Sequence, residues 1–459
     1  MYDEKMSIMA SAKSRTGSED SSSERLRELG YKQELKRELS VLSNFAFSFS
    51  IISVLTGITT LYNTGLTYGG TATLVYGWIV AGLFTFTVGL SMAEICSSFP
   101  TSGGLYFWSA KLAGRTWAPF ASWITGWFNM VGQWAVTTSV DFSLALLIQE
   151  MILLSTGGGN GGGYKASKLV VVSLHGGILL LHGLINSLPI SVLSLFGQLA
   201  ALWNLLGVVV LTILIPSVAT ERASPHSVFT SFNTDNGVGI RSNAYIFLLG
   251  LLMSQYTLTG YDASAHMTEE TRDADKNGPK GIISAIFVSF IFGWFYIIGI
   301  SFAVPDIQSV LSVQNDAGGY AIAEIFYSAF KRRYGNGIGG IMCLGVVAVA
   351  VFFCGMSSVT SNSRYFSLNI YLIFLASPRQ DGVCVLTRRR DAVFFDLAQS
   401  EWPGRPHQRC LALRRGFLLH GFAVCRECGG VSGDGVDSDD RAVHCVRAAD
   451  TVESDTCEE

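Results

Sequence analysis

The chain contains 459 residues, of which 49% are hydrophobic and 15% are charged, and its formal net charge at pH 7 is −3. A soluble domain normally carries about a quarter charged residues, so this composition argues against a soluble protein. The slightly negative charge also argues against nucleic acid as a partner, because surfaces that bind nucleic acid are strongly basic.

The first 39 residues are polar and charged. They are rich in Ser, Lys, Arg and Glu and contain no apolar stretch that could serve as a secretory signal. We therefore expect residues 1–39 to form a cytosolic segment. Lysine and arginine in the short loops further along the chain give a moderate bias in the same direction, because cytoplasmic loops are enriched in positive charge.

The region 40–364 is mostly apolar. A helix that spans a bilayer needs about 20 predominantly apolar residues. Eight stretches meet this requirement, and they lie at about 41–62, 70–95, 117–154, 168–187, 189–217, 243–266, 281–304 and 338–362. The sequence therefore predicts an all-α, multi-pass integral membrane protein whose principal surroundings are the lipid bilayer.

Two of the eight segments contain residues that interrupt a helix. The first reads SFSIISVLTGITT, with Ser and Thr around Gly57, and the sixth reads SQYTLTGYDASAHMTEE. Broken membrane helices present free backbone groups to a substrate near the middle of the bilayer. A zwitterionic amino acid suits such a site, because N–H groups bind its carboxylate and carbonyl groups bind its ammonium group. The same residues would also permit close helix packing without any binding role, and spacing alone leaves both interpretations open.

Ionisable side chains inside membrane segments are costly and are often functional. Asp141 lies well inside the third segment, and Asp262 lies beside the suspected break in the sixth. Either carboxylate could bind and release a proton during transport, although local pairing would explain both residues equally well. His175, His182 and His266 also fall in apolar segments, and we expect these histidines to be structural.

Two strings resemble signature loops of the amino acid–polyamine–organocation permeases. They are AEICSSFPTSGGLYFWSA after the second segment and GYDASAHMTEETRDADKNGPKGI after the sixth. Over roughly residues 29–364 the chain closely resembles the plant bidirectional amino-acid and GABA permease group. The resemblance implies a secondary active transporter of amino acids, with GABA among the candidate substrates. It also implies a LeuT-like fold of two inverted five-helix repeats, about twelve helices in all, that works by alternating access.

The resemblance carries the substrate site onto the two helix breaks. The positions that would face the substrate carboxylate are Ser53, Leu55, Thr56 and Gly57. The positions whose carbonyl groups would face the ammonium group are Thr257, Thr259 and Gly260. Asp262 matches an acidic position that some relatives use in gating or proton linkage. Other relatives keep a lysine in the fifth helix in place of a sodium ion, but residues 189–217 contain no lysine or arginine.

A different class of protein, a membrane-bound enzyme, is the second hypothesis. The sequence contains no metal-binding pair, nucleophile triad or phosphate-binding loop in the apolar region, so we predict no catalytic residues, no metal and no cofactor. Conversion of a substrate into a product would favour the enzyme, whereas uptake of an unchanged substrate favours the transporter.

The resemblance ends at Arg364, and the segment 365–459 is rich in Arg, Cys and Asp. Its Cys425, Cys428, His444 and Cys445 suggest a zinc site, an interpretation that we reject. When the coding bases from Asp381 onward are read one base out of frame, they can restore the permease pattern, including apolar stretches of membrane-spanning length.

The junction supports a splicing explanation. An AGG codon for Arg364 followed by TAT for Tyr365 creates a GT donor, and a CAG codon for Gln380 supplies an AG acceptor. We therefore expect residues 365–380 to be a translated intron, followed by out-of-frame sequence that is disordered. The transmembrane region 40–364 would then hold about eight of roughly twelve helices. The alternative function is a truncated, non-transporting or regulatory isoform, or a gene-model artefact of such a permease.

Overall fold

The computed structural model describes residues 39–101 and 103–375, and all of the regular elements in this part of the chain are helices. The long helices are α4 (Gly70–Ser98), α6 (Gly114–Ser155), α7 (Lys168–Asn186), α8 (Ile190–Val218), α12 (Ala274–Ser301) and α15 (Ile338–Leu375). The shorter helices are α2 (Val41–Ile52), α3 (Val54–Thr67), α5 (Gly104–Leu112), α9 (Pro225–Thr230), α10 (Asn243–Thr257), α11 (Ala263–His266), the 3₁₀ helix η1 (Thr268–Glu270), α13 (Ile307–Leu311) and α14 (Ala321–Tyr334). The prediction of an all-α fold is confirmed.

Seven helical segments within the described residues are long and apolar enough to cross a membrane, with α2 and α3 counted as one. They correspond to seven of the eight predicted segments. The remaining prediction, 243–266, is interrupted, because α10 ends at Thr257 and α11 begins only at Ala263. Gly260, with a φ of +100°, lies between the two helices in a conformation that glycine adopts readily. Neither part is long enough to span a bilayer as a continuous helix.

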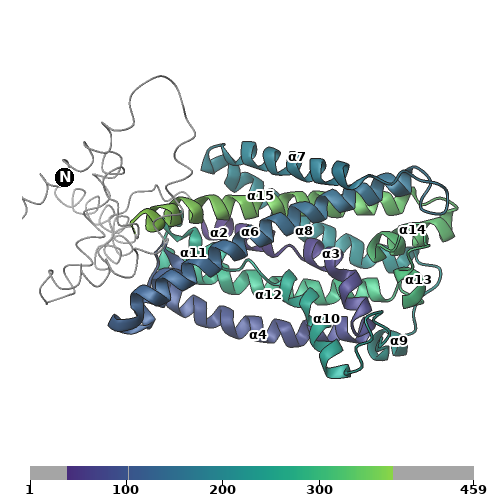
Figure 1. Ribbon diagram of the computed structural model, residues 1–459, viewed down its shortest axis with the longest axis horizontal. Coiled ribbons are helices and arrows are strands. Elements are labelled where there is room, and N and C mark those ends of the chain that lie inside the picture. The colour runs from purple at the N-terminus through teal and green to yellow at the C-terminus, as the bar shows by residue number, and fades with distance from the viewer. Residues whose placement is uncertain (1–38, 102, 376–459) are drawn as a thin grey trace, which may run out of the picture. The chain divides into compact units, whose positions relative to one another are not determined.

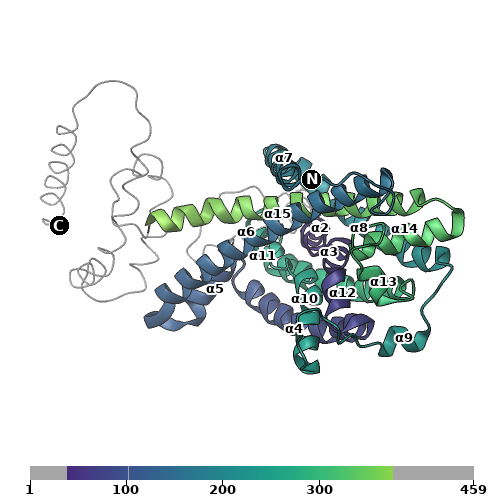
Figure 2. The same cartoon turned by 45° about the vertical axis from the view of Figure 1, so that its right-hand side comes forward.

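The broken helix α2–α3 lies in the middle of the bundle (Figure 1). In its most apolar stretch 83% of the residues are buried, compared with 17% in α7 at the edge of the bundle. Helix α2 packs against α8 and α12, and α3 packs against α10. Figure 2 shows α5 at one end of the bundle and α9, α13 and α14 at the opposite end. The central position of α2 and α3 means that a break between them faces protein on all sides.

Helices α4 and α12 pack closely because glycine lines their interface. A Cβ atom added at Gly82 would overlap the ring of Phe290, and one added at Gly293 would overlap the ring of Trp78. Trp78 is fully buried, and its Nε1 atom donates a hydrogen bond to the carbonyl oxygen of Phe290 at 2.9 Å. Since α4 follows the break in α2–α3 and α12 follows the break in α10–α11, the two halves of the chain begin with the same arrangement. This order of elements is the one expected of an inverted repeat.

Helix α15 continues to Leu375. The segment 365–375 reads YFSLNIYLIFL, and its apolar side chains favour continuation of a membrane helix. Residues 1–38 and 376–459 lie outside the described part of the chain. The predicted cytosolic segment, the proposed acceptor at Gln380, the disordered tail and the four zinc-like residues from Cys425 to Cys445 all fall there.

Candidate functional site

The first helix break consists of one residue. Helix α2 ends at Ile52 and α3 begins at Val54, and Ser53 between them has φ +27° and ψ 85°. Positive φ is uncommon for a residue other than glycine. The Ser53 N–H group still donates to the carbonyl of Phe49 at 3.0 Å, and the Ser53 carbonyl accepts from Gly57 N–H at 3.1 Å. The break therefore redirects the chain and places the N-terminus of α3 inside the protein.

The hydroxyl groups of Ser53 and Thr56 lie beside this N-terminus, 2.6 Å apart. The first N–H groups of a helix have no acceptor within the helix, and the helix dipole adds partial positive charge. A carboxylate near the start of α3 would therefore meet the free N–H groups, the two hydroxyl groups and a favourable electrostatic potential. Ser53, Leu55 and Thr56 are all nearly completely buried, so such an anion would be shielded from water.

Asn204 on α8 occupies part of this position in the structure. Its Oδ1 atom accepts a hydrogen bond from Leu55 N–H at 3.4 Å, and its Nδ2 atom is buried without a hydrogen-bonding partner among the described residues. The prediction for residues 189–217 concerned only charged side chains and missed this amide. Gln198 and Asn204 are the two side-chain amides of the mostly apolar helix α8, and an amide in such a helix is the signal that could have identified Asn204.

The second break covers residues 258–262. The Thr257 hydroxyl donates to the carbonyl of Met253 at 2.7 Å, and the Thr259 hydroxyl donates to the carbonyl of Tyr256 at 2.6 Å. Both hydroxyls therefore bond within their own turn, where they help to end α10. The carbonyl groups of Leu258 and Thr259 accept no hydrogen bond from the described residues. These are the backbone acceptors that could receive an ammonium group.

The two broken helices come into contact beside their breaks. A Cβ atom added at Gly57 would lie 2.5 Å from Thr257 Oγ1 and 2.7 Å from Thr257 Cα, and one added at Gly260 would overlap the side chain of Ile51. The structure thus brings Gly57 and Thr257 together, whereas the side chain of Thr259 is exposed. No side chain fits at residue 57 beside Thr257, so the two broken helices are in direct contact there.

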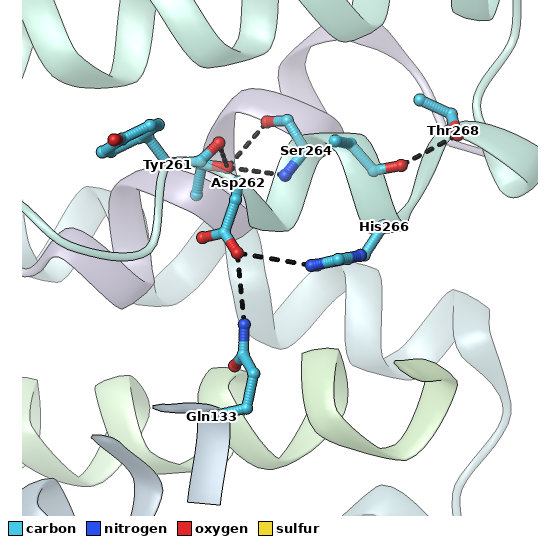
Figure 3. Close-up of polar contacts among 8 residues, drawn as sticks. Gln133, Tyr261, Asp262, Ser264, His266 and Thr268 are labelled. Atoms are coloured by element: carbon cyan, nitrogen blue, oxygen red, sulfur yellow. Dashed lines mark hydrogen bonds and ion pairs between the residues drawn. The ribbon is translucent and has the colours of Figure 1, made fainter. Parts of the chain in front are cut away.

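Asp262 lies at the end of the second break (Figure 3). Its Oδ2 atom accepts a hydrogen bond from Gln133 Nε2 at 3.2 Å and lies 3.3 Å from His266 Nε2. The carboxylate therefore connects the break to α6, which carries Gln133. The Asp262 side chain is 17% exposed, so most of its surface is covered by protein.

Asp141 lies elsewhere on α6 and pairs with a different helix. Its two carboxylate oxygens lie 3.1 Å and 3.3 Å from Nδ1 of His182 on α7, and both side chains are completely buried. Asp141 and Gln133 are separated by about two helical turns. The two acidic residues singled out from the sequence thus belong to two distinct histidine–carboxylate pairs.

Comparisons with known proteins cover the region that contains both breaks. The model of a family described as amino acid permease matches residues 39–368. The chain is 77% identical over 345 residues to Amino-acid permease BAT1 of Arabidopsis thaliana, which covers 75% of this chain and 67% of that protein. It is 76% identical over 348 residues to Amino-acid permease BAT1 homolog of rice, covering 76% and 67%. A GABA-specific permease of Saccharomyces cerevisiae is 32% identical over 345 residues, covering 74% of this chain and 58% of the relative.

Proposed function

The chain belongs to the amino acid permease family, and from this premise we propose that it moves amino acids across a membrane by alternating access, with the two helix breaks as its substrate site. The observation that carries the proposal is the contact of the two breaks at Gly57 and Thr257 in the centre of the bundle. Gly57 lies in the first turn of α3 and Thr257 ends α10, so this contact brings the N-terminal end of α3 against the C-terminal end of α10.

In the proposed cycle the carboxylate of the amino acid binds at the N-terminus of α3, and its ammonium group binds the carbonyl groups of Leu258 and Thr259. Opening on either side of the membrane separates Gly57 from Thr257, and the closed structure is the state between the two openings. The chemistry is recognition of a charged pair by backbone dipoles, so the substrate leaves unchanged. This reaction class distinguishes the transporter from a membrane-bound enzyme.

The proposal extends to proton coupling, to the range of substrates and to the orientation in the membrane. Asp262 and Asp141 are the candidates for proton coupling or gating, because both are acidic residues within membrane segments. GABA is a candidate substrate, because a more distant relative is a GABA-specific permease. The N-terminal segment faces the cytosol, in agreement with the distribution of lysine and arginine.

Counterflow into proteoliposomes tests the proposal. The full chain is reconstituted into vesicles preloaded with one neutral, one acidic and one basic amino acid, and GABA, and the same compounds are supplied outside in radiolabelled form. Exchange of at least one of them above the level of protein-free vesicles is expected. Absence of exchange for all of them, with correctly folded protein in the vesicles, would favour the non-transporting alternative.

Replacement of Asn204 by leucine should tighten substrate binding and destabilise the empty protein. The substitution removes the acceptor of the Leu55 N–H group in the closed site, and an unpaired buried N–H group costs about 1 kcal/mol or more. A bound carboxylate would satisfy that N–H group again, so the cost falls on the empty state alone. About 1 kcal/mol corresponds to a roughly fivefold lower Kd, which radioligand binding to the purified chain can measure.

Gln198→Leu on the same helix is the control for this substitution. The Gln198 amide donates to the Ser43 hydroxyl at 3.2 Å, away from the break, so its loss should lower stability without tightening binding. Equal or weaker substrate binding in Asn204→Leu would contradict the assignment of Leu55 N–H to the substrate carboxylate.

We also propose that residues 365–380 derive from a translated intron. A spliced transcript would join Arg364 to the shifted frame that begins at Asp381. Sequencing of transcripts across the codons for Ser363 to Asp381 is expected to find spliced molecules with GT and AG at the two junctions. Genomic sequence without those dinucleotides, or retention of the segment in all transcripts, would contradict the proposal.

A further inference from the structure

The pair of Asp141 and His182 is completely buried. Both side chains have no solvent exposure, and the imidazole Nδ1 atom faces both carboxylate oxygens. The Nε2 atom of His182 is also buried, and it has no hydrogen-bonding partner among the described residues. One nitrogen of the ring therefore holds the carboxylate, while the other remains available to take up or release a proton.

Helix α15 closes over the pair. The ring of Phe352 lies 4.6 Å from the imidazole ring, and a Cβ atom added at Gly355 would overlap the Asp141 carboxylate and lie 2.8 Å from His182 Cε1. Glycine at residue 355 thus allows α15 to cover the two side chains directly. A buried carboxylate with a single histidine as its ion-pair partner is stable only if the pair retains a proton or gains another donor.

Few other titratable groups lie near the pair. Helices α2, α3, α8 and α10 contain no charged residue, and Asp141 is the only charged residue of α6 between Arg115 and Glu150. The Cys354 thiol on α15 donates to the carbonyl of Ile51, and the ring of His175 on α7 packs edge-on against Phe142. The phenol of Tyr256 on α10 is hydrogen-bonded to the hydroxyl of Ser139 at 2.7 Å. The charge of the pair is therefore set by Asp141 and His182 themselves.

A row of polar groups continues from Asp141 along one face of α6. Asp141, Thr137 and Gln133 follow one another at four-residue spacing, which places them on the same side of a helix. Asn362 on α15 bridges two of them, since its Nδ2 atom donates to Thr137 Oγ1 at 2.6 Å and to the carbonyl of Gln133 at 3.2 Å.

Gln133 in turn contacts the second histidine–carboxylate pair. Its Nε2 atom donates to Asp262, whose carboxylate lies beside His266 (Figure 3). The row of Asp141, Thr137 and Gln133, which we call the α6 polar row, thus lies between a fully buried pair and a pair at the second helix break. Chains of Asp, Glu and His side chains form proton relays in membrane proteins, and each of the two pairs joins an aspartate to a histidine.

We propose that the Asp141–His182 pair binds the proton that accompanies the amino acid. The inference rests on the proposed transport function and adds the identity of the proton-binding group. In the loaded state His182 carries protons on both nitrogens beside the Asp141 carboxylate, and the pair is neutral. On release the pair gives up one proton and then carries one negative charge. No bond other than N–H forms or breaks in this step.

Accumulation driven by a pH gradient tests this inference separately from transport itself. Proteoliposomes containing the full chain are made one pH unit more acidic outside than inside, and the panel compound with the fastest counterflow is the probe. If one proton accompanies each substrate molecule, accumulation can reach about tenfold. Asp141→Asn and His182→Gln are expected to lose this accumulation while they retain counterflow, because exchange needs no net proton movement.

His175→Gln is the matched control, since it makes the same change on the same helix outside the pair, and it should accumulate substrate like the unmodified chain. Gly355→Ala is a second test variant, because it displaces both side chains without removing either group. It should reduce accumulation in the same way.

The outcomes separate the two claims. Absence of counterflow in the unmodified chain would overturn the proposed transport function. Counterflow without gradient-driven accumulation in the unmodified chain would overturn the proton site alone. Full accumulation in His182→Gln would also overturn the proton site. Loss of counterflow in Asp141→Asn, His182→Gln and Gly355→Ala alike would overturn it as well, because it would show that the role of the pair is packing.

Discussion

Replacement of Gly57 by alanine is expected to reduce amino-acid uptake about 5- to 160-fold, the factor that corresponds to about 1–3 kcal/mol. The added methyl group would lie 2.7 Å from the Cα atom of Thr257, and a backbone atom cannot rotate out of the way. The two broken helices would have to separate, at a cost of about 1–3 kcal/mol for an overpacked contact. Because alternating access passes through the closed state, a higher barrier at this contact slows every cycle. Uptake into proteoliposomes and the melting temperature of the purified chain measure the two consequences.

Gly132→Ala provides the control for this substitution. Gly132 also lies in a long helix, but an added Cβ atom there meets nothing within 4 Å. Alanine should be neutral or slightly stabilising at that position, because it has a higher helix propensity than glycine. Uptake by Gly57→Ala at the rate of Gly132→Ala would contradict the close approach of the two breaks.

Ser48→Ala is expected to destabilise the chain more than any serine substitution at the surface of the bundle. The Ser48 hydroxyl on α2 accepts a hydrogen bond from Ser264 N–H at 2.9 Å and lies 2.7 Å from the Ser264 hydroxyl. Both residues are completely buried, so water cannot replace the lost partner. An unsatisfied buried group costs about 1–3 kcal/mol, and the loss also releases α11 from α2 beside the substrate site. Thermal unfolding should therefore shift to lower temperature, and uptake should fall.

The matched control is Ser98→Ala at the end of α4. Ser98 is exposed and bonds only to the Glu94 carbonyl of its own helix at 3.2 Å. Its replacement should leave both melting temperature and uptake unchanged. If Ser48→Ala unfolds at the temperature of the unmodified chain, the tie between α2 and α11 does not contribute to stability.

The positions of the helix breaks could be predicted from the sequence, because local chemistry determines them. Gly57 and Gly260 stand among hydroxyl residues in otherwise apolar runs, a pattern that weakens a helix wherever it occurs. The apolar runs also predicted the seven long membrane segments and the interrupted segment 243–266, since bilayer thickness fixes the length of a spanning helix.

The partners of the buried polar groups could not be predicted, because they depend on how distant helices pack. The bond between Leu55 and Asn204 joins residues 149 positions apart, and the Asp141–His182 pair joins residues 41 positions apart. No local pattern marks either pairing. The exposure of Thr259 has the same origin, since the turn at Gly260 sets the direction in which this side chain points.

Binding of amino-acid analogues to the purified full chain tests the central claim most directly. A ligand at one hundred times its Kd stabilises the folded state by about 2.7 kcal/mol, which a thermal unfolding assay detects. We expect a saturable rise in melting temperature with an intact amino acid, and little or none with its methyl ester or its N-acetyl derivative. Each derivative removes one of the two charges that the helix breaks are proposed to bind. An equal rise with all three compounds, or none with any amino acid tested, would contradict a substrate site built from the two breaks.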